Sequence, residues 1–355
     1  MPQPHLFSPL TIRAVTFRNR IGVSPMCQYS SADGLATDWH LVHLGSRAVG
    51  GAGLVMTEAT AVDPRGRIGS SDLGIWSDDH LPGLARVANF IAAQGAVPAV
   101  QLAHAGRKAS TAPPWQGGHS VSPDAGGWVP VAPSPIPFDD RSPVPDALDE
   151  AGIAGVVEAF GEAARRAREA GFKVVEIHAA HGYLLHEFLS PLTNQRTDMY
   201  GGSYDNRLRI VKEVCRAVRG EWPDDLPLFL RISASDWHDA GWNTDNSVAL
   251  AHHISRCGVD LIDCSSGGIA PGIPIPAGPG YQVPFSQRIK DTVPVLTAAV
   301  GFITSAPQAD QIIRTEQANL VLLGREMLRD PYWPLRAAKA LGHEIAWPNQ
   351  YRRAE

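Results

Sequence analysis

The chain alternates between short apolar runs and longer segments in which apolar residues recur at helical spacing. Eight of the short runs are rich in Val, Ile and Leu and carry few charges, as strands buried on both faces require. We predict strands at residues 20–24, 53–57, 97–102, 173–178, 226–232, 261–264, 295–298 and 320–323. Eight strands separated by helical segments favour a closed (β/α)8 TIM barrel over an open sheet.

The clearest helical pattern covers residues 148–170. Its apolar residues recur on one face, and its charged residues fall mainly on the other faces. The apolar positions are Ile153, Val156, Val157, Phe160, Ala164 and Ala167. Gly171 follows directly and is suited to end the helix.

Three segments interrupt the alternation, one of which is the polar, loop-like stretch at residues 189–207. Residues 10–17 predict a short β-hairpin ahead of the first barrel strand. Residues 109–145, after the third strand, are rich in Pro, Gly and Ser and have neither a helical nor a strand period. A segment of this length is either a functional loop or locally disordered. No linker composition divides the chain, so we predict a single domain over residues 1–355.

Composition excludes several classes of protein. The 355 residues are 44% apolar and carry a formal net charge of -5, without the clustered Lys and Arg of a nucleic-acid-binding protein. No apolar run reaches the roughly 18 to 20 residues that span a bilayer. Residues 1–10 are polar and proline-rich, so we expect no signal peptide. Four scattered cysteines without a CxxC pair indicate a reduced, cytoplasmic, soluble protein.

In a TIM barrel, chemistry gathers at the carboxyl ends of the strands. Gly301 and Gly324 follow the seventh and eighth predicted strands, where barrels of this type often bind phosphate through backbone N–H groups. Arg325 could add a charge-assisted contact to the same anion. The alternative is that both glycines only turn the chain.

His178 and His181 end the fourth predicted strand and are three residues apart. Two imidazoles there could donate hydrogen bonds to a substrate oxygen, hold a metal, or be ordinary polar residues at a strand end. A metal would need a third ligand, and Glu176 is the one nearby candidate in the sequence, which is weak evidence. If these residues did bind a metal, the chain would be a metal-dependent barrel hydrolase. Tyr183 is either a rim tyrosine or a proton donor to a developing carbanion.

Arg231 and Cys27 also stand at strand ends. A buried arginine needs a partner, which either an electron-rich cofactor ring or a core carboxylate could supply. Cys27 has no adjacent His or Lys in the sequence, so its spacing does not argue for an activated thiolate, and a small core cysteine is the alternative.

From residue 6 to residue 353 the chain resembles the Old Yellow Enzyme family (NADH:flavin oxidoreductases and NADPH dehydrogenases), in its thermophilic-like bacterial branch. The resemblance rests on long motifs in a fixed order at the strand ends. They are SPMCQYSS at 24–31, EATAV at 58–62, QLAHAGRKA at 101–109, EIHAAHGYLLHEFLSPLTNQRTDMYGGSYDNR at 176–207, RISASDW at 231–237 and GREMLRDPYW at 324–333.

The resemblance implies an ene-reductase with non-covalent FMN, which takes hydride from NADPH or NADH and passes it to the β-carbon of an activated alkene. A flavin-binding module without turnover is a further alternative. The implied contacts of the flavin ring are Ser24, Pro25, Met26, Cys27, Ala59, Gln101 and Arg231, and those of the phosphate are Gly301, Gly324 and Arg325.

The resemblance also implies roles toward the substrate. His178 and His181 would bind its carbonyl or nitro oxygen with help from Tyr29, and Tyr183 would protonate the α-carbon. Cys27 would tune the redox potential of the flavin and contact the substrate.

An arginine in the tail at residues 350–353, Arg353 with Arg352 as its rival, would reach the site of a neighbouring subunit in a homodimer or homotetramer. The aromatic residue that shapes the far side of the pocket is left open among Trp115, Trp128, Phe302 and Trp333.

Overall fold

The computed structural model describes residues 5–355, so residues 1–4, part of the stretch in which we expect no signal peptide, lie outside the described residues. Eight parallel strands close into a barrel, each beside the next in the chain, and the last pairs with the first. They are β3 (Ile21–Val23), β4 (Leu54–Ala61), β5 (Val97–Ala103), β8 (Val174–Ala179), β9 (Leu228–Ser233), β10 (Leu261–Ser265), β11 (Leu296–Ala299) and β12 (Leu320–Leu323). All eight predicted strands are confirmed, and the fold is a (β/α)8 TIM barrel.

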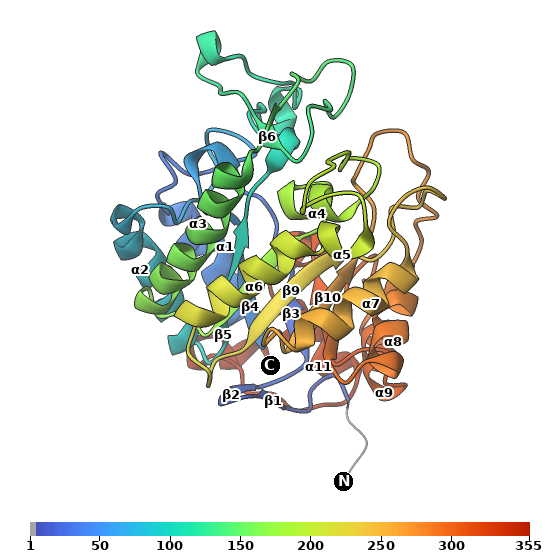
Figure 1. Ribbon diagram of the computed structural model, residues 1–355. Helices are drawn as coiled ribbons and strands as arrows, with labels where there is room; N and C mark the ends of the chain where they lie inside the picture. Colours follow the sequence, from blue (N-terminus) through green and yellow to red (C-terminus); the bar gives the residue numbers. More distant parts are fainter. Residues whose placement is uncertain (1–4) are drawn as a thin grey trace.

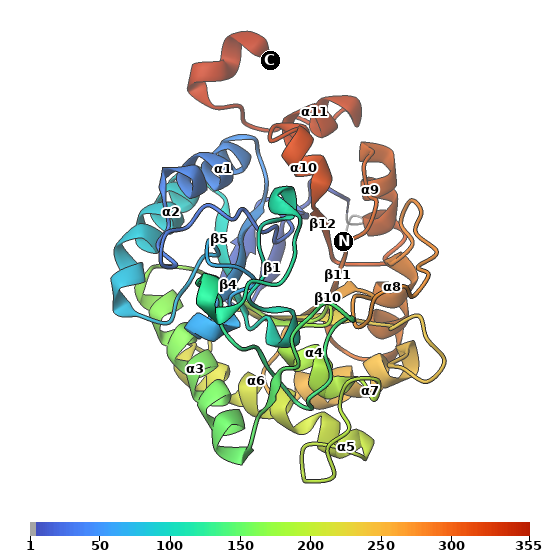
Figure 2. The ribbon, with the colours of Figure 1, turned by 90° about the horizontal axis from the view of Figure 1, so that it is seen from above.

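Helices surround the barrel as an outer ring, seen from above in Figure 2. The longer ones are α1 (Asp38–Val49), α2 (Leu81–Ala93), α3 (Glu150–Glu169), α6 (Arg209–Glu221), α7 (Thr244–Ser255), α8 (Val283–Thr292), α9 (Ala306–Arg314) and α11 (Trp333–Ala340). Short helices α4 (Leu184–Leu189) and α10 (Arg325–Arg329) follow strand ends, and α5 (Tyr204–Arg207) lies between α4 and α6.

Helix α3 illustrates how the sequence sets an element of the ring. The side chain of Asp149 accepts a hydrogen bond from the backbone N–H of Gly152 and so caps its first turn. Five of its six predicted apolar positions are buried, whereas Val157 is partly exposed. The helix ends at Glu169 with Ala170 as its C-cap, and Gly171 takes a left-handed φ of 89° just beyond it, as a terminating glycine does.

The lower end of the barrel is closed, as Figure 1 shows. Strands β1 (Leu10–Ile12) and β2 (Val15–Phe17) form the predicted hairpin there. Its side chains Ile12, Val15 and Phe17 pack on the first layer of barrel residues, including Phe229. Burial of this layer stabilises the barrel.

Residues 109–145 lie over that opposite end (Figure 1). They fold into short 3-10 turns, η4 (Pro114–Gln116) and η5 (Pro123–Ala125), and strand β6 (Val131–Ala132), which pairs with β7 (Asp146–Ala147). Thr111 and Ser120 form a further bridge. The segment is therefore a folded loop with its own backbone pairing, and the alternative of local disorder was wrong.

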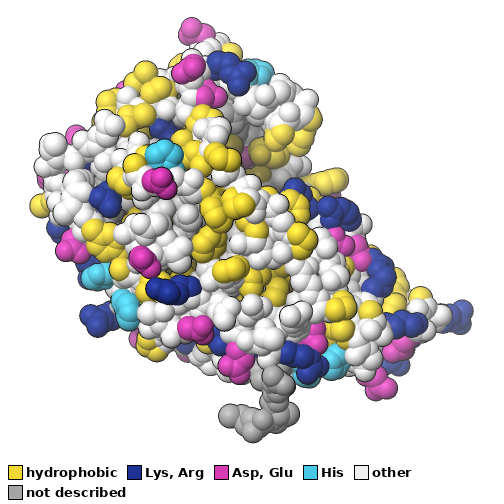
Figure 3. All heavy atoms as spheres, turned by 90° about the vertical axis from the view of Figure 1, so that its right-hand side faces the viewer, with side chains coloured by type: hydrophobic (Ala, Val, Ile, Leu, Met, Phe, Trp, Pro, Cys, Tyr) yellow, Lys and Arg dark blue, Asp and Glu magenta, His cyan; other side chains and the backbone are white. Residues whose placement is uncertain are grey.

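The surface charges and the cysteines are distributed as follows. On the face drawn in Figure 3, acidic and basic side chains are interspersed and neither sign gathers into a patch. Cys27, Cys215, Cys257 and Cys264 are all free thiols. Each helix within residues 5–355 is too short or too polar to serve as a transmembrane span.

Candidate active site

The two histidines at the end of β8 lie in contact with each other. The Nδ1 atom of His178 accepts a hydrogen bond from the backbone N–H of Ala180 at 3.1 Å, which assigns the proton to Nε2. The ring of His181 lies 5.1 Å from that of His178, nearly perpendicular to it, and its Nε2 atom is 2.7 Å from Ser265 Oγ. The two imidazoles thus meet edge to face at the carboxyl end of β8.

The backbone between the histidines is held in an unusual shape. His181 has a φ of 59°, and a Cβ atom on Gly182 would lie 2.1 Å from the carbonyl oxygen of Gly268. The backbone N–H of Gly182 donates to Nδ1 of His186 at 2.9 Å, and Nε2 of the same imidazole lies 2.9 Å from Asp236 Oδ1. This fully buried His–Asp pair fixes the turn that carries His181.

Burial keeps the reacting groups neutral. It lowers the pKa of both His178 and His181 well below the ordinary value, and the charge of Arg231 lowers the pKa of each further. Burial also raises the pKa of the Tyr183 phenol well above its ordinary value. At neutral pH the site therefore offers two neutral imidazoles and a protonated phenol.

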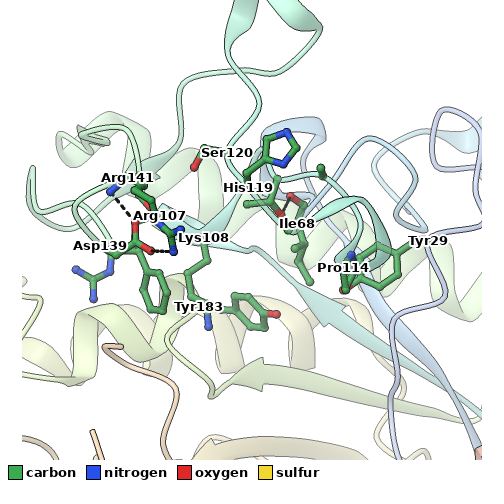
Figure 4. Close-up of a pocket in the computed structure, with 16 residues that line it drawn as sticks. Tyr29, Ile68, Arg107, Lys108, Pro114, His119, Ser120, Asp139, Arg141 and Tyr183 are labelled. Carbon is green, nitrogen blue, oxygen red and sulfur yellow. Dashed lines mark hydrogen bonds and ion pairs between the residues drawn. The ribbon is translucent and has the colours of Figure 1, made fainter. Parts of the chain in front are cut away.

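Tyr183 stands at the start of α4, with its ring 5.0 Å from the ring of His178. Tyr183 and Tyr29 line a cavity of about 360 Å³ beneath the loop at 109–145 (Figure 4). Lys108 and Phe138 lie on the wall of the same cavity. The structure thus brings the predicted oxygen-binding pair, proton donor and Tyr29 to one place.

The buried partners of Arg231 are carboxylates in the barrel core. A core carboxylate was one of the two partners that the sequence suggested for this arginine. Its Nε atom pairs with Asp263 and lies 3.8 Å from Glu176 Oε1, while Nη2 donates to Ser24 Oγ at 2.7 Å. Gln101 Nε2 donates to the same Glu176 oxygen at 2.7 Å. Burial lowers the pKa of Arg231, but Asp263 and then Glu176 more than offset this and raise it.

These contacts place three of the predicted flavin residues, Ser24, Gln101 and Arg231, in one buried network on the inner face of the barrel. Arg231 stays charged there, because its pKa is raised. Burial, followed by the charge of Asp263, raises the pKa of Glu176 to about 8.

A second, smaller cavity of about 100 Å³ is lined by Gly301, Gly324 and Arg325. A Cβ atom on Gly324 would lie 3.8 Å from Met26 Sδ and 4.0 Å from Ser24 Cβ, so this cavity adjoins the segment at 24–27. The space that Gly324 leaves beside Arg325 can accommodate a phosphate. The adjoining segment at 24–27 can then contact the flavin ring that this phosphate group carries. The residues present therefore fit FMN.

Cys27 follows β3 and carries a free thiol. Burial, followed by the carboxylates of Asp72 and Glu58, raises the pKa of this thiol well above its ordinary value. The protonated thiol is not an activated nucleophile.

Other predicted residues are not brought to this site. Arg353 and its rival Arg352 lie in η6 (Asn349–Ala354), exposed and outside the helical ring beside α1 and α11 (Figure 2). Within residues 5–355, no three His, Cys, Asp or Glu side chains could together hold a metal. The hydrolase alternative therefore lacks its third ligand.

The four aromatic candidates for the far side of the pocket lie in different places in the structure. Trp115 meets the ring of Tyr29 edge-on at 5.4 Å, beside the substrate cavity. Trp128 packs on Arg67, Phe302 lies under Arg325 at 4.5 Å, and Trp333 is buried. Trp115 is thus the candidate that adjoins the cavity.

Sequence reasoning missed several residues of the site. Lys108 was given no role although it stands within one of the long motifs, and the carboxylate partners of Arg231 come from different strands. His186 could have been suspected, because it follows His181 by five residues in a histidine-rich turn. Its partner Asp236 lies fifty residues further on, where spacing gives no signal.

Residues 5–344 match the model of the NADH:flavin oxidoreductase / NADH oxidase family. The chain belongs to this family. It is 49% identical over 351 residues to an NADPH dehydrogenase of Bacillus cytotoxicus, covering 98% of this chain and 96% of that protein. It is 48% identical to an NADPH dehydrogenase of Halalkalibacterium halodurans over 351 residues, 98% of each chain.

Solved structures agree. Morphinone reductase superimposes with a TM-score of 0.81 at 28% identity, over 98% of this chain and 92% of that one. An Old Yellow Enzyme homologue from Zymomonas mobilis gives 0.79 at 25% identity, over 95% and 93%. The predicted family and cofactor are confirmed, and the chain is an FMN-dependent oxidoreductase of the Old Yellow Enzyme type that uses a reduced nicotinamide as hydride donor.

Proposed function

We propose that this flavin oxidoreductase is an ene-reductase for α,β-unsaturated carbonyl or nitro compounds. The observation that carries the proposal is a pair of neutral imidazoles beside a protonated phenol: the ring of Tyr183, which lines the cavity, lies 5.0 Å from the ring of His178. FMN, when bound, supplies a ring that accepts hydride from the nicotinamide and returns it to the β-carbon of the alkene. NADPH is the favoured donor, because the relatives of nearly full length are named NADPH dehydrogenases.

His178 and His181 bind the activating oxygen of the substrate. Negative charge grows on this oxygen as the β-carbon receives hydride, and donors fixed in advance stabilise that charge. The lowered pKa of both rings means that they donate as neutral imidazoles. Tyr29, on the wall of the same cavity, assists in binding this oxygen.

Tyr183 completes the reduction by giving its phenolic proton to the α-carbon. One hydride and one proton together convert the C=C bond into a C–C bond with two new C–H bonds. The raised pKa of Tyr183 keeps the proton on the phenol until the carbanion develops.

The flavin ring would be held by Ser24, Pro25, Met26, Cys27, Ala59, Gln101 and Arg231, and its phosphate would be held by Gly301, Gly324 and Arg325. Arg231 supplies a fixed positive charge on the inner face of the barrel, and Cys27 adjusts the redox potential. Residues 1–355 act as one FMN-binding domain in this proposal.

The test is the visible absorption of the purified protein, followed anaerobically through addition of NADPH and then of cyclohexenone. We expect a flavin band near roughly 450 nm that bleaches with NADPH and returns with the enone, as a cofactor that carries hydride in two steps requires. A band that bleaches but does not return would leave a flavin reductase or a binding module and refute the ene-reductase proposal.

A further inference from the structure

We propose that Lys108 makes the substrate cavity a site for an anionic group, so that the preferred alkenes of this enzyme carry a carboxylate. This inference rests on the proposed ene-reductase function. The ammonium group of Lys108 projects from the turn η3 (Gly106–Lys108) after β5 into the cavity that Tyr183 lines (Figure 4).

Two of the three hydrogen-bond donors of the Lys108 ammonium group have acceptors in the protein. Lys108 Nζ donates to the carbonyl oxygen of His181 at 2.9 Å and lies 3.4 Å from that of Gly268. An ammonium has three protons, and the third has no partner among the described residues. That proton is available to an acceptor on a bound ligand.

Aromatic faces enclose the same charge. Lys108 Nζ lies 4.8 Å from the ring centre of Phe138 and 5.1 Å from that of Tyr183. Such faces favour a cation and exclude water from it, which strengthens its attraction for an anion.

The neighbouring acid does not neutralise the charge of Lys108. Burial raises the pKa of Glu187 to about 8, so this carboxyl is largely protonated at neutral pH. Burial lowers the pKa of Lys108 to about 8 against the opposing effect of Glu187, and most of the ammonium stays charged at pH 7. Within residues 5–355, Lys108 takes part in no ion pair, so a buried cation is left without a counter-ion.

The other charges on the cavity wall are already engaged. Arg107 donates to the backbone carbonyls of Ile136, Pro137 and Ile269. Asp139 accepts hydrogen bonds from Ser142 Oγ and the backbone N–H of Arg141, within its own loop. The side chain of Arg141 is 93% exposed at the rim, where solvent screens its charge.

The position of Lys108 favours the alkene over the coenzyme as the source of the anion. Its ammonium group touches the ring of Tyr183 and the backbone of His181, the residues proposed to act on the reacting alkene. The phosphates of a nicotinamide coenzyme are separated from its reacting ring by at least a ribose. A carboxylate attached near the C=C bond reaches Lys108 while the activating oxygen stays on the histidines.

The experiment compares (E)-4-oxopent-2-enoate with its carboxamide, which differ in charge but little in shape. The readout is the ratio of kcat/KM for the acid to kcat/KM for the amide. We expect Lys108→Met to lower this ratio by about 10- to 100-fold, the loss of one charge-assisted hydrogen bond, and Lys108→Arg to retain most of it. Arg141→Gln, a control for the exposed rim charge, changes the ratio by less than about threefold.

Each alternative gives a different result. If Lys108 only braces the carbonyl of His181, Lys108→Met lowers kcat/KM for both alkenes equally, and the unchanged ratio overturns the inference. If Lys108→Met instead slows flavin reduction by NADPH more than flavin reduction by NADH, Lys108 binds a phosphate of the coenzyme. That result also overturns the inference. Retention of the flavin band shows that each variant is folded, with Lys108→Gln as a second neutral variant.

Failure of the ene-reductase proposal would look different again. In that case the wild-type enzyme, once reduced, would be reoxidised by neither the acid nor the amide. Turnover of the amide by the wild type therefore establishes the function, and the ratio alone tests Lys108.

Discussion

At the scale of single residues, burial sorts the ionisable groups of the site into two sets. His178, His181, Tyr183 and Cys27 are all held in their neutral forms, because burial moves each pKa away from the charged form. Arg231 keeps its charge through buried carboxylate partners. The groups proposed to bind the activating oxygen and to protonate the alkene are therefore neutral, and the fixed charge of Arg231 lies in the barrel core.

Tyr183→Phe tests this division between groups. The phenol acts only when the alkene receives its proton, so we expect reoxidation by an enone to slow by about 10²- to 10⁴-fold, the usual contribution of a general acid. Flavin reduction by NADPH needs no proton from Tyr183 and should change by less than about threefold. Stopped-flow absorption resolves the two half-reactions.

The matched control is Tyr200→Phe. This tyrosine donates to Glu213 at 3.1 Å, and its contacts lie outside the cavity. It should affect neither half-reaction. Equal slowing of both half-reactions in Tyr183→Phe would reject its assignment as proton donor.

At the scale of elements, strands were predictable because burial on both faces leaves a continuous apolar run. Where polar residues enter a strand the prediction stopped early. Residues 53–57 were predicted, but β4 continues to Ala61, and its last residues include Glu58 and Thr60, both buried. A register shift between Met56 and Ala59 marks the same place. Polar residues at the carboxyl end of a strand break its apolar pattern, so sequence periodicity underestimates the length of the strand.

The interior of the site could not be predicted in the same way. Neighbouring strands place Glu176, Arg231 and Asp263 side by side, although 55 and 32 residues separate Arg231 from its partners. Spacing along the chain does not report such contacts. The direction of the Lys108 side chain depends equally on a folded turn. The FMN residues were identified from ordered motifs rather than from periodicity.

The loop at 109–145 contacts the rest of the protein through Arg67, whose guanidinium group packs against two tryptophan rings. The guanidinium of Arg67 lies 4.8 Å from the ring of Trp128 and 5.3 Å from that of Trp76. Trp128 also donates through Nε1 to the carbonyl of Arg65 at 2.8 Å. We therefore expect Arg67 to hold the loop over the substrate cavity.

Arg67→Ala should loosen the loop without unfolding the barrel. Loss of contacts worth about 0.5 to 2 kcal/mol predicts roughly 3- to 30-fold faster hydrogen exchange in residues 109–145, with unchanged protection of the barrel strands. Arg86→Ala, which removes an exposed pair with Asp38, is the control. Unchanged exchange in the loop would show that Arg67 does not fasten it.

At the scale of the whole molecule, the barrel has one closed end, one catalytic end and a tail outside the ring. Two large apolar side chains of α1, Trp39 and Val42, are 55% and 66% exposed. Helix α1 itself lies on the side of the barrel where the tail leaves (Figure 2). Trp39 donates through Nε1 to Gln28 Oε1 at 3.0 Å, so this face is joined to the segment that carries Tyr29. We propose that a second copy covers this face and lends Arg353 to the neighbouring site.

Mixed oligomers test this directly. Arg353→Ala should lower kcat/KM for an enone by about tenfold if a charge-assisted contact is lost, and Arg352→Ala should lower it less. When Arg353→Ala and Tyr183→Phe subunits are co-expressed with different tags and purified as hybrids, one site combines an intact Tyr183 with the partner's intact tail. Activity therefore recovers in the hybrid only if the arginine acts across the interface. A hybrid no more active than its parents, or a wild-type protein that sediments as a monomer, would refute the role of the tail.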